Sequence, residues 1–211
     1  SSNLDEFFMV RVASLKDMVH ANYKKKDIAG MTASEQLEKI NERTRELVTL
    51  QYNTYNRSLV PLMHQHGIVV IDAFEDLSES QAAFVDRYFE DNVYPVLTPM
   101  AVDASRPFPL IRNKTLNIAA LLSKKKGKAE KEEIEFATVQ VPSVLPRLVH
   151  IPSEDGNEKT FILLEQVIER NIDKLFLNYD VLCAYPYRVM RNADLSIDED
   201  EAADLLKEIQ K

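Results

Sequence analysis

Glycine, cysteine and tryptophan are scarce in this 211-residue sequence, which contains four Gly, one Cys and no Trp. The glycines, at positions 30, 67, 127 and 156, are too few and too far apart for the phosphate-binding loops of a dinucleotide-binding fold or a P-loop protein. The one cysteine, Cys183, cannot form an internal disulfide, nor can it hold a structural metal by itself. Two common nucleotide-binding motifs and a disulfide framework are therefore excluded.

Long apolar runs and an excess of basic residues are also missing. No apolar run approaches the roughly 18 residues that a membrane-spanning helix requires. The 26 Lys and Arg residues are outnumbered by 34 Asp and Glu residues, so the net charge is −8, which argues against a general affinity for nucleic acid or anionic lipid. We expect a cytoplasmic protein without a transmembrane segment or a nucleic-acid partner, and we leave open a membrane association through a longer parent protein.

The first part of the chain carries two helix-start motifs, each followed by apolar residues at helical spacing. Asn3 precedes a helix predicted over residues 4–22, and Thr32 precedes a second helix predicted over residues 33–58. A short polar segment, residues 23–30, joins the two helices. Helices joined by so short a link favour an antiparallel hairpin.

The second part of the chain has shorter apolar runs and more proline. Ser78, with Gln81 three residues later, predicts another capped helix. The remaining pattern predicts strands over residues 68–71, 116–122, 134–141, 161–164 and 181–190, and helices over residues 165–175 and 199–209. The fold class is therefore α+β: an N-terminal antiparallel helical hairpin followed by a mixed α/β domain.

We place the domain boundary near residue 75, which gives domains over residues 1–75 and 76–211. The first contains 9 basic and 10 acidic residues, and the second contains 17 and 24, so most of the negative charge lies in the second domain.

The residues that most often carry catalysis form no convincing group. His64 and His66 end a predicted helix, where histidine is favoured by the helix dipole, so a structural role is preferred to a zinc site and a metal hydrolase is the least favoured hypothesis. Cys183 lies in an apolar predicted strand, which is typical of an inert buried thiol. The acidic run 198–201 lacks the spacing of a calcium loop and fits the first turn of a helix better.

Two lysine clusters and one asparagine are candidates for contacts with phosphate groups. Lys24–Lys26 and Lys124–Lys128 are more typical of solvated loops than of a polyanion site. Asn3 is expected to be a helix N-cap, and its amide NH₂ group remains able to donate a hydrogen bond to a ligand.

The opening stretch Ser2-Asn3-Leu4-Asp5-Glu6-Phe7-Phe8-Met9-Val10-Arg11-Val12 resembles the S-N-L-D-E-F-x-x-V-R motif of bacterial polyphosphate kinases. The likeness continues through the rest of the chain. It covers Tyr94-Pro95-Val96-Leu97-Thr98-Pro99, Phe136–Pro142 with Pro146-Arg147, and the segment Phe161–Phe176 with its Glu165, Glu169, Arg170, Asn171 and Lys174.

The resemblance implies a fragment: the end of an N-terminal helical domain followed by most of a middle, or head, domain. The parent enzyme of such a family transfers the γ-phosphoryl group of ATP reversibly to polyphosphate through a phosphohistidine, with Mg²⁺. The histidines and metal-binding groups belong to C-terminal domains outside these residues, so the resemblance implies no catalytic residue and no metal ligand here.

The resemblance further implies that Asn3 contacts ATP and that the head domain contributes to subunit association, so a homo-oligomer is expected. The surroundings of Phe108, Tyr185 and Tyr187 are candidate interface positions. The fragment alone is expected to be inactive. The alternative hypothesis is a non-enzymatic helical protein-interaction module in which Asn3 is only a cap.

Overall fold

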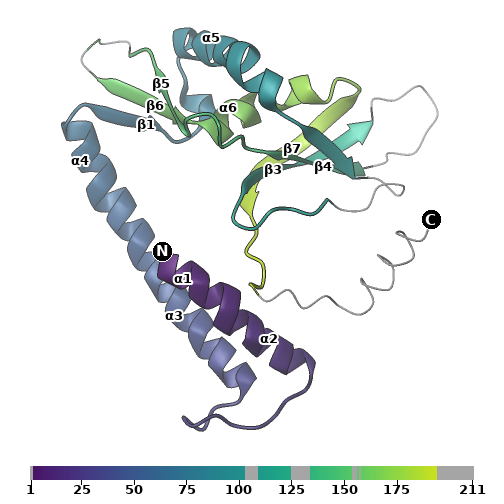
Figure 1. Cartoon of the computed structure of the whole chain (residues 1–211). Helices are drawn as coiled ribbons and strands as arrows, with labels where there is room; N and C mark the ends of the chain where they lie inside the picture. The colour runs from purple at the N-terminus through teal and green to yellow at the C-terminus, as the bar shows by residue number, and fades with distance from the viewer. Residues whose placement is uncertain (1, 103–108, 125–133, 154–155, 157, 194–211) are drawn as a thin grey trace, which may run out of the picture. The chain divides into compact units, whose positions relative to one another are not determined.

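The structure is a computed structural model, and it describes residues 2–102, 109–124, 134–153, 156 and 158–193 (Figure 1). These residues form two compact units: unit 1 comprises residues 2–49 with 190–193, and unit 2 comprises residues 50–189. Several predictions lie outside the described residues, namely the helix over 199–209, the acidic run 198–201, most of the second lysine cluster, and Phe108.

Unit 1 is built from two antiparallel helical runs (Figure 1). The first is continuous through α1 (Ser2–Phe7), the π-helical turn η1 (Phe8–Val12) and α2 (Ala13–His20), and the second is α3 (Ala33–Thr54). Nη2 of Arg11 donates a hydrogen bond to Oε1 of Gln36 at 2.8 Å, which joins the two runs. The predicted hairpin is confirmed.

The capping chemistry of unit 1 agrees with prediction at one helix start and differs at the other. At the start of α3, the backbone N–H of Thr32 donates to Oε2 of Glu35 at 2.7 Å, and the N–H of Glu35 donates to Oγ1 of Thr32 at 3.4 Å. The first helix already begins at Ser2, so Asn3 is its second residue rather than its N-cap. Serine and asparagine are both favoured at N-caps, so the sequence pattern alone does not fix which residue of Ser1-Ser2-Asn3 precedes the helix.

The second helical run is longer than predicted. Beyond α3 it continues through the π-helical turn η2 (Tyr55–Leu59) into α4 (Val60–Gln65), past Pro61. The wider π turn immediately before Pro61 relieves the clash between a proline ring and the preceding helical turn. Gly67, with a φ of 68°, ends the run.

Unit 2 contains two sheets. One has the strand order β1-β6-β5, and the other has the order β2-β4-β3-β7. The strands are β1 (Ile68–Ile71), β2 (Pro99–Val102), β3 (Leu116–Lys124), β4 (Ile134–Gln140), β5 (Leu148–Ile151), β6 (Lys159–Leu163) and β7 (Tyr179–Arg188). The five predicted strands are confirmed. The short strands β2 and β5 were not predicted, and neither was the parallel pairing of β1 with β6.

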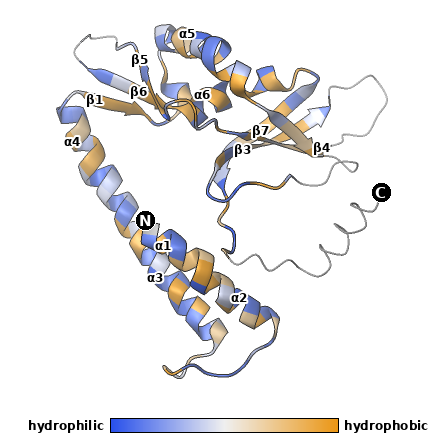
Figure 2. Ribbon diagram, in the orientation of Figure 1, coloured by the Kyte–Doolittle hydropathy of each residue, from blue (hydrophilic) through white to orange (hydrophobic). Residues whose placement is uncertain are grey.

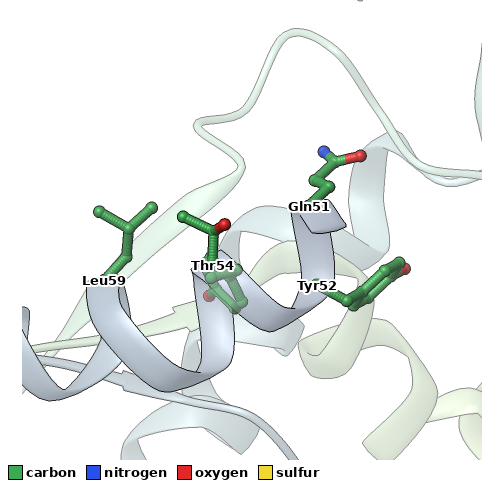
Figure 3. Close-up of a pocket in the computed structure, with 5 residues that line it drawn as sticks. Gln51, Tyr52, Thr54 and Leu59 are labelled. Carbon is green, nitrogen blue, oxygen red and sulfur yellow. The ribbon is translucent and has the colours of Figure 1, made fainter. Parts of the chain in front are cut away.

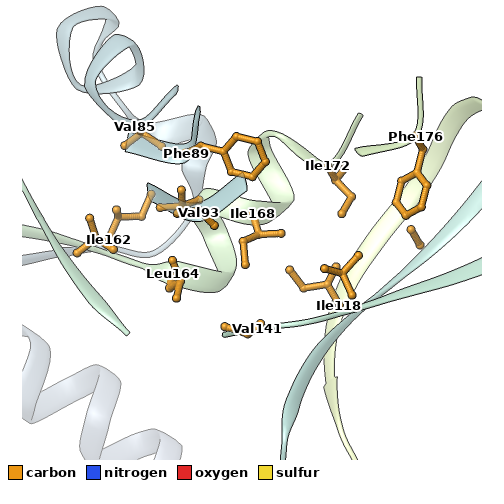
Figure 4. Packing of buried hydrophobic residues seen from close by; sticks show 14 of the residues in the cluster. Val85, Phe89, Val93, Ile118, Val141, Ile162, Leu164, Ile168, Ile172 and Phe176 are labelled. Atoms are coloured by element: carbon orange, nitrogen blue, oxygen red, sulfur yellow. The ribbon is translucent and has the colours of Figure 1, made fainter. Parts of the chain in front are cut away.

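Helices of unit 2 pack against these sheets around one hydrophobic core. The helical elements are η3 (Phe74–Asp76), α5 (Glu79–Tyr88), η4 (Phe89–Val93), η5 (Tyr94–Val96), α6 (Leu164–Arg170) and η6 (Ile172–Leu175). Ser78 and Gln81 form the predicted capping box at the start of α5, in which the side chain of each accepts a hydrogen bond from the backbone N–H of the other. Phe89, Ile118, Ile162 and Ile168 are fully buried in the core, which draws side chains from η4, α6 and both sheets (Figure 4). The α+β fold class is confirmed.

No helix among the described residues is long and apolar enough to span a membrane.

Candidate functional site

Asn3 lies in the first turn of α1, and its side chain is exposed to solvent. The first turn of a helix has backbone N–H groups without helical partners, and the positive end of the helix dipole lies there. An exposed amide at this position can donate through NH₂ and accept through its oxygen. The position of Asn3 is therefore suited to a hydrogen bond with a polar or anionic ligand.

The histidines do not form a metal centre with other described residues. His64 lies in the last turn of α4, His66 is the residue that follows the helix, and both are exposed. No group of three His, Cys, Asp or Glu side chains in the described ranges is placed to hold a metal ion. The ring of His150 packs edge-on against Phe161, with 5.3 Å between ring centres.

A hollow of about 500 Å³ lies along the helical run of unit 2 (Figure 3). Its described lining comes from α3 and η2: Gln51, Tyr52, Thr54, Tyr55 and Leu59. None of these side chains carries a charge, so this wall offers no counter-charge to a phosphate group. Its composition suits an apolar or aromatic group better than the polyanionic part of a nucleotide.

The apolar residues of η2 and α4 correct one expectation. The helical spacing of Tyr55, Leu59 and Leu62 indicated an apolar stripe, but their exposed fractions are 38%, 48% and 51%. Hydrophobic and hydrophilic residues alternate along both helices (Figure 2). The helical spacing shows that these residues share one side of the helical run. It does not show whether other described residues cover that side, and the exposed fractions show that it is partly open to solvent.

An ion pair between Arg147 and Glu165 stabilises the architecture of unit 2. The guanidinium group of Arg147 donates from Nε to both carboxylate oxygens of Glu165, at 3.1 and 3.2 Å, and from Nη2 to Oε1. The Glu165 side chain is only 5% exposed, whereas that of Arg147 is 64% exposed. Arg147 therefore supplies the counter-charge that a buried carboxylate requires.

Two further ion pairs connect the helices of unit 2. Arg170 donates to the carboxylate of Asp86 from Nε at 2.8 Å and from Nη2 at 3.0 Å, and these hydrogen bonds lower the pKa of Asp86. Nζ of Lys174 lies 2.7 Å from Oε1 of Glu90 and 5.8 Å from the centre of the Phe89 ring. Arg170 and Lys174 thus fasten α6 and η6 to α5 and η4.

Glu169 is the most perturbed acid among the described residues. Burial, together with the neighbouring negative charges of Glu165 and Glu75, raises its pKa from 4.5 to about 7. Nε2 of Gln166 donates to its Oε2 at 2.9 Å, while the N–H of Phe74 donates to Oε1 of Gln166 at 3.2 Å. The shift thus has its cause in the packing of α6, which carries Glu165 and Glu169, against η3, which carries Glu75.

Sequence reasoning did not predict the structural roles of Arg147, Glu165 and Arg170, although all three lie in the segments that resemble the family. A motif shows that residues recur together, but it does not distinguish ion pairs that hold helices from groups that bind a substrate. The partners Arg147 and Glu165 are separated by 17 intervening residues, and Asp86 and Arg170 by 83, so helical spacing could not reveal either pair.

Comparisons with known proteins place the chain in one family over almost its whole length. The model described as polyphosphate kinase N-terminal domain matches residues 1–71, and the model described as polyphosphate kinase middle domain matches residues 80–211.

Individual proteins give the same result. The chain is 51% identical over 210 residues to a polyphosphate kinase of Lactiplantibacillus plantarum, covering 100% of this chain and 28% of that protein. It is 50% identical over 212 residues to a polyphosphate kinase of Halalkalibacterium halodurans, covering 100% of this chain and 29% of that protein. The crystal structure of polyphosphate kinase from Porphyromonas gingivalis superimposes with a TM-score of 0.77 at 26% identity, over 99% of this chain and 31% of that one.

The chain thus spans about three-tenths of the length of these relatives. Both domain descriptions, the curated relatives and the solved structure agree with the resemblance of the opening motif. The chain belongs to the polyphosphate kinase family.

Proposed function

We propose that these residues are part of a longer enzyme that transfers the γ-phosphoryl group of ATP reversibly to polyphosphate through a phosphohistidine. The observation that carries this proposal is the match of two successive polyphosphate kinase domains over residues 1–71 and 80–211. The N-terminal helical domain would comprise residues 1–75 and the middle domain residues 76–211. The reacting histidines and the Mg²⁺ ligands would lie in the remainder of the longer protein.

Within that enzyme, Asn3 would contact ATP. Its position in the family's opening motif and its exposed amide in the first helical turn support this role. A single neutral hydrogen bond contributes about 0.5–1.5 kcal/mol, so its loss raises the apparent Michaelis constant by roughly 2- to 12-fold. By itself such a contact is far too weak to bind ATP measurably, and these 211 residues alone should be inactive.

The test compares the longer enzyme, wild type and Asn3→Ala, in ATP-dependent polyphosphate synthesis. We expect a higher KM for ATP, a nearly unchanged kcat, and a melting temperature that is unchanged or slightly raised, because alanine favours a helix more than asparagine does. Asn41→Ala is the matched control, since Asn41 is exposed on α3 and lies outside the opening motif. An unchanged KM in the Asn3 variant would remove Asn3 from the nucleotide site, and an inactive wild-type enzyme would overturn the kinase assignment.

We also propose that the enzyme is a homo-oligomer, to which the middle domain contributes. Light scattering of the longer protein tests this directly, and a monomer at all concentrations would contradict it.

A second candidate function is that of a helical interaction module. The exposed Tyr52, Leu59 and Leu62 of the helical run favour it, because such a surface suits a partner helix. The Asn3 experiment separates the two, since an interaction module makes no polyphosphate.

A further inference from the structure

One end of the four-stranded sheet is basic, although the chain as a whole is acidic, with a net charge of −8. It is the end where β2 and β3 begin and where β4 and β7 finish. The described residues there are 97–99, 109–117, 138–142 and 186–189. These segments contain Arg112, Lys114 and Arg188 and no Asp or Glu. We call the three basic residues the basic sheet end. A local excess of positive charge attracts anions.

Backbone hydrogen bonds bring the three basic residues together. The N–H of Lys114 donates to the carbonyl oxygen of Val189, the residue after Arg188, at 2.9 Å. Arg112 begins the turn that contains Lys114, because the N–H of Thr115 donates to its carbonyl oxygen at 3.3 Å. With about 5 Å between paired α-carbons and 3.8 Å between consecutive ones, the α-carbon of Lys114 lies within roughly 10 Å of the other two. Three long cationic side chains can therefore reach one ligand.

The charged groups of the basic sheet end are accessible. Arg112 and Arg188 are exposed, and Lys114 is half-buried. No carboxylate in the described ranges forms an ion pair with Arg112. By contrast, Arg147 and Arg170 of the same unit are each paired with a carboxylate. The guanidinium group of Arg112 is thus open to an anion from solution.

The turn holds Lys114 in a conformation that lysine rarely adopts. Its φ is 63°, in the left-handed region that suits glycine and costs energy for other residues. Oγ1 of Thr115 donates to the carbonyl oxygen of Arg112 at 2.8 Å, and Nδ2 of Asn117 donates to Oγ1 of Thr115 at 3.1 Å. The charge of lysine, rather than its backbone preference, therefore suits this position. A turn braced in this way also reduces the entropy lost when a ligand binds.

The arrangement suits a ligand with several negative charges in a row. A linear chain of phosphate groups has one negative charge on each phosphate, so neighbouring phosphates can meet neighbouring cations. Single-stranded nucleic acid also has such charges, but its binding sites offer aromatic rings on which bases stack. Residues 109–117, which supply two of the three cations, contain no aromatic residue.

We propose that the basic sheet end binds inorganic polyphosphate. The inference rests on the proposed function for the identity of the ligand. It adds a binding site within these 211 residues, and it assigns no catalytic role to Arg112, Lys114 or Arg188.

The test measures binding of medium-chain inorganic polyphosphate to the 211-residue chain by isothermal titration calorimetry at several salt concentrations. Arg112→Gln and Arg188→Gln should each raise Kd about 3- to 10-fold, because each removes one charged contact with the chain. The slope of log Kd against log salt should also become flatter by about one for each lost contact.

Lys114→Gly separates binding from folding. Glycine adopts a positive φ without strain, so the melting temperature should be unchanged or higher while Kd rises by a similar factor. Arg87→Gln is the matched control, since Arg87 is an exposed arginine of α5 whose neighbours in sequence include Asp86 and Glu90. It removes the same charge and should leave Kd unchanged.

Two other ligands test the identity of the anion. ATP and a single-stranded RNA should each bind at least about tenfold more weakly than polyphosphate, since ATP makes fewer phosphate contacts and RNA finds no stacking platform. Equal affinity for ATP would identify a nucleotide site, and equal affinity for RNA would identify a general polyanion site. Either result would overturn the inference.

The inference also fails if the wild-type chain does not bind polyphosphate, if Kd is unchanged in all three variants, or if Arg87→Gln raises Kd as much as they do. Polyphosphate synthesis by the longer enzyme, measured separately, tests the proposed function. If that enzyme makes polyphosphate while the three variants bind it as the wild type does, the site is wrong and the proposed function stands. If polyphosphate binds at these residues and the enzyme makes none, the reverse holds.

Discussion

The two units of this chain have very different amounts of core. In unit 1 the buried hydrophobic residues are Val12, Leu15 and Ala33, whereas all other buried hydrophobic residues described here belong to unit 2. Unit 1 instead exposes large apolar side chains, among them Phe7, Val10 and Leu47. Burial of apolar surface is the main source of stability, so unit 2 carries the means to fold by itself, while unit 1 depends more on helix propensity and on contacts made elsewhere.

The polar interactions follow the same division. Arg43 and Glu46 form an ion pair on α3 in unit 1, with side chains 71% and 55% exposed. In unit 2, the Glu165 partner of Arg147 is 5% exposed. An exposed pair competes with water and contributes little, whereas a buried carboxylate depends on its partner. Charge pairs should therefore contribute most to stability where one partner is buried in the core.

The largest expected effect is the loss of stability when a core residue of each unit is truncated. Phe89→Ala should lower the free energy of unfolding of unit 2 by about 3–5 kcal/mol, because it leaves a cavity in a fully buried site. Leu15→Ala should cost unit 1 about 2 kcal/mol. Hydrogen exchange with urea titration, followed by peptide, separates the units; one shared transition that both variants lower equally would show that the units do not unfold independently.

Removing one arginine from each unit tests whether a buried ion pair contributes more to stability than an exposed one. Arg147→Ala should destabilise unit 2 by about 2–3 kcal/mol, because it leaves the Glu165 carboxylate buried without its charged donor. Arg43→Ala is the matched substitution in unit 1 and should cost less than about 0.5 kcal/mol. Urea denaturation of both variants measures the difference, and equal costs would contradict the dependence on burial.

Glu169 of unit 2 should make the stability of the protein depend on pH. Its folded-state pKa of about 7 lies above the ordinary value of 4.5, so between these values the folded protein binds the proton more readily than the unfolded chain. Stability therefore falls as the pH rises from 4.5 to 7, and the full cost remains above pH 7. Glu169→Gln should remove this slope and raise the melting temperature at pH 8.

The pH experiment needs a control because other carboxylates titrate as well. In unit 1, hydrogen bonds from Thr32 lower the pKa of Glu35, which gives the opposite slope at lower pH. Subtracting the melting temperatures of Glu169→Gln from those of the wild type at each pH isolates Glu169. A flat difference between pH 4.5 and 8 would show that Glu169 is not perturbed.

Local chemistry predicted most of the elements in both units. The capping boxes that begin with Thr32 and Ser78 predicted two helix starts. Runs of β-branched and other apolar residues predicted β1, β3, β4, β6 and β7. These predictions succeed because caps and side-chain periodicity act within a few residues. The sequence left open whether Pro61 ends or only kinks the second helix, and the structure shows that the run continues through a π turn, whose formation depends on how the whole run is accommodated.

The opening motif, with Asn3, and the absence of glycine-rich phosphate loops follow from residue identity alone, and so does the family to which the chain belongs. Tertiary structure decided which strands pair, for instance β1 with β6, and which side chains are buried. It also joined Arg147 to Glu165 and Asp86 to Arg170, and it brought Lys114 and Arg188 to one end of a sheet. Such relations depend on segments far apart in the sequence, whose proximity is set by the burial of a common core and by strand register rather than by local preference.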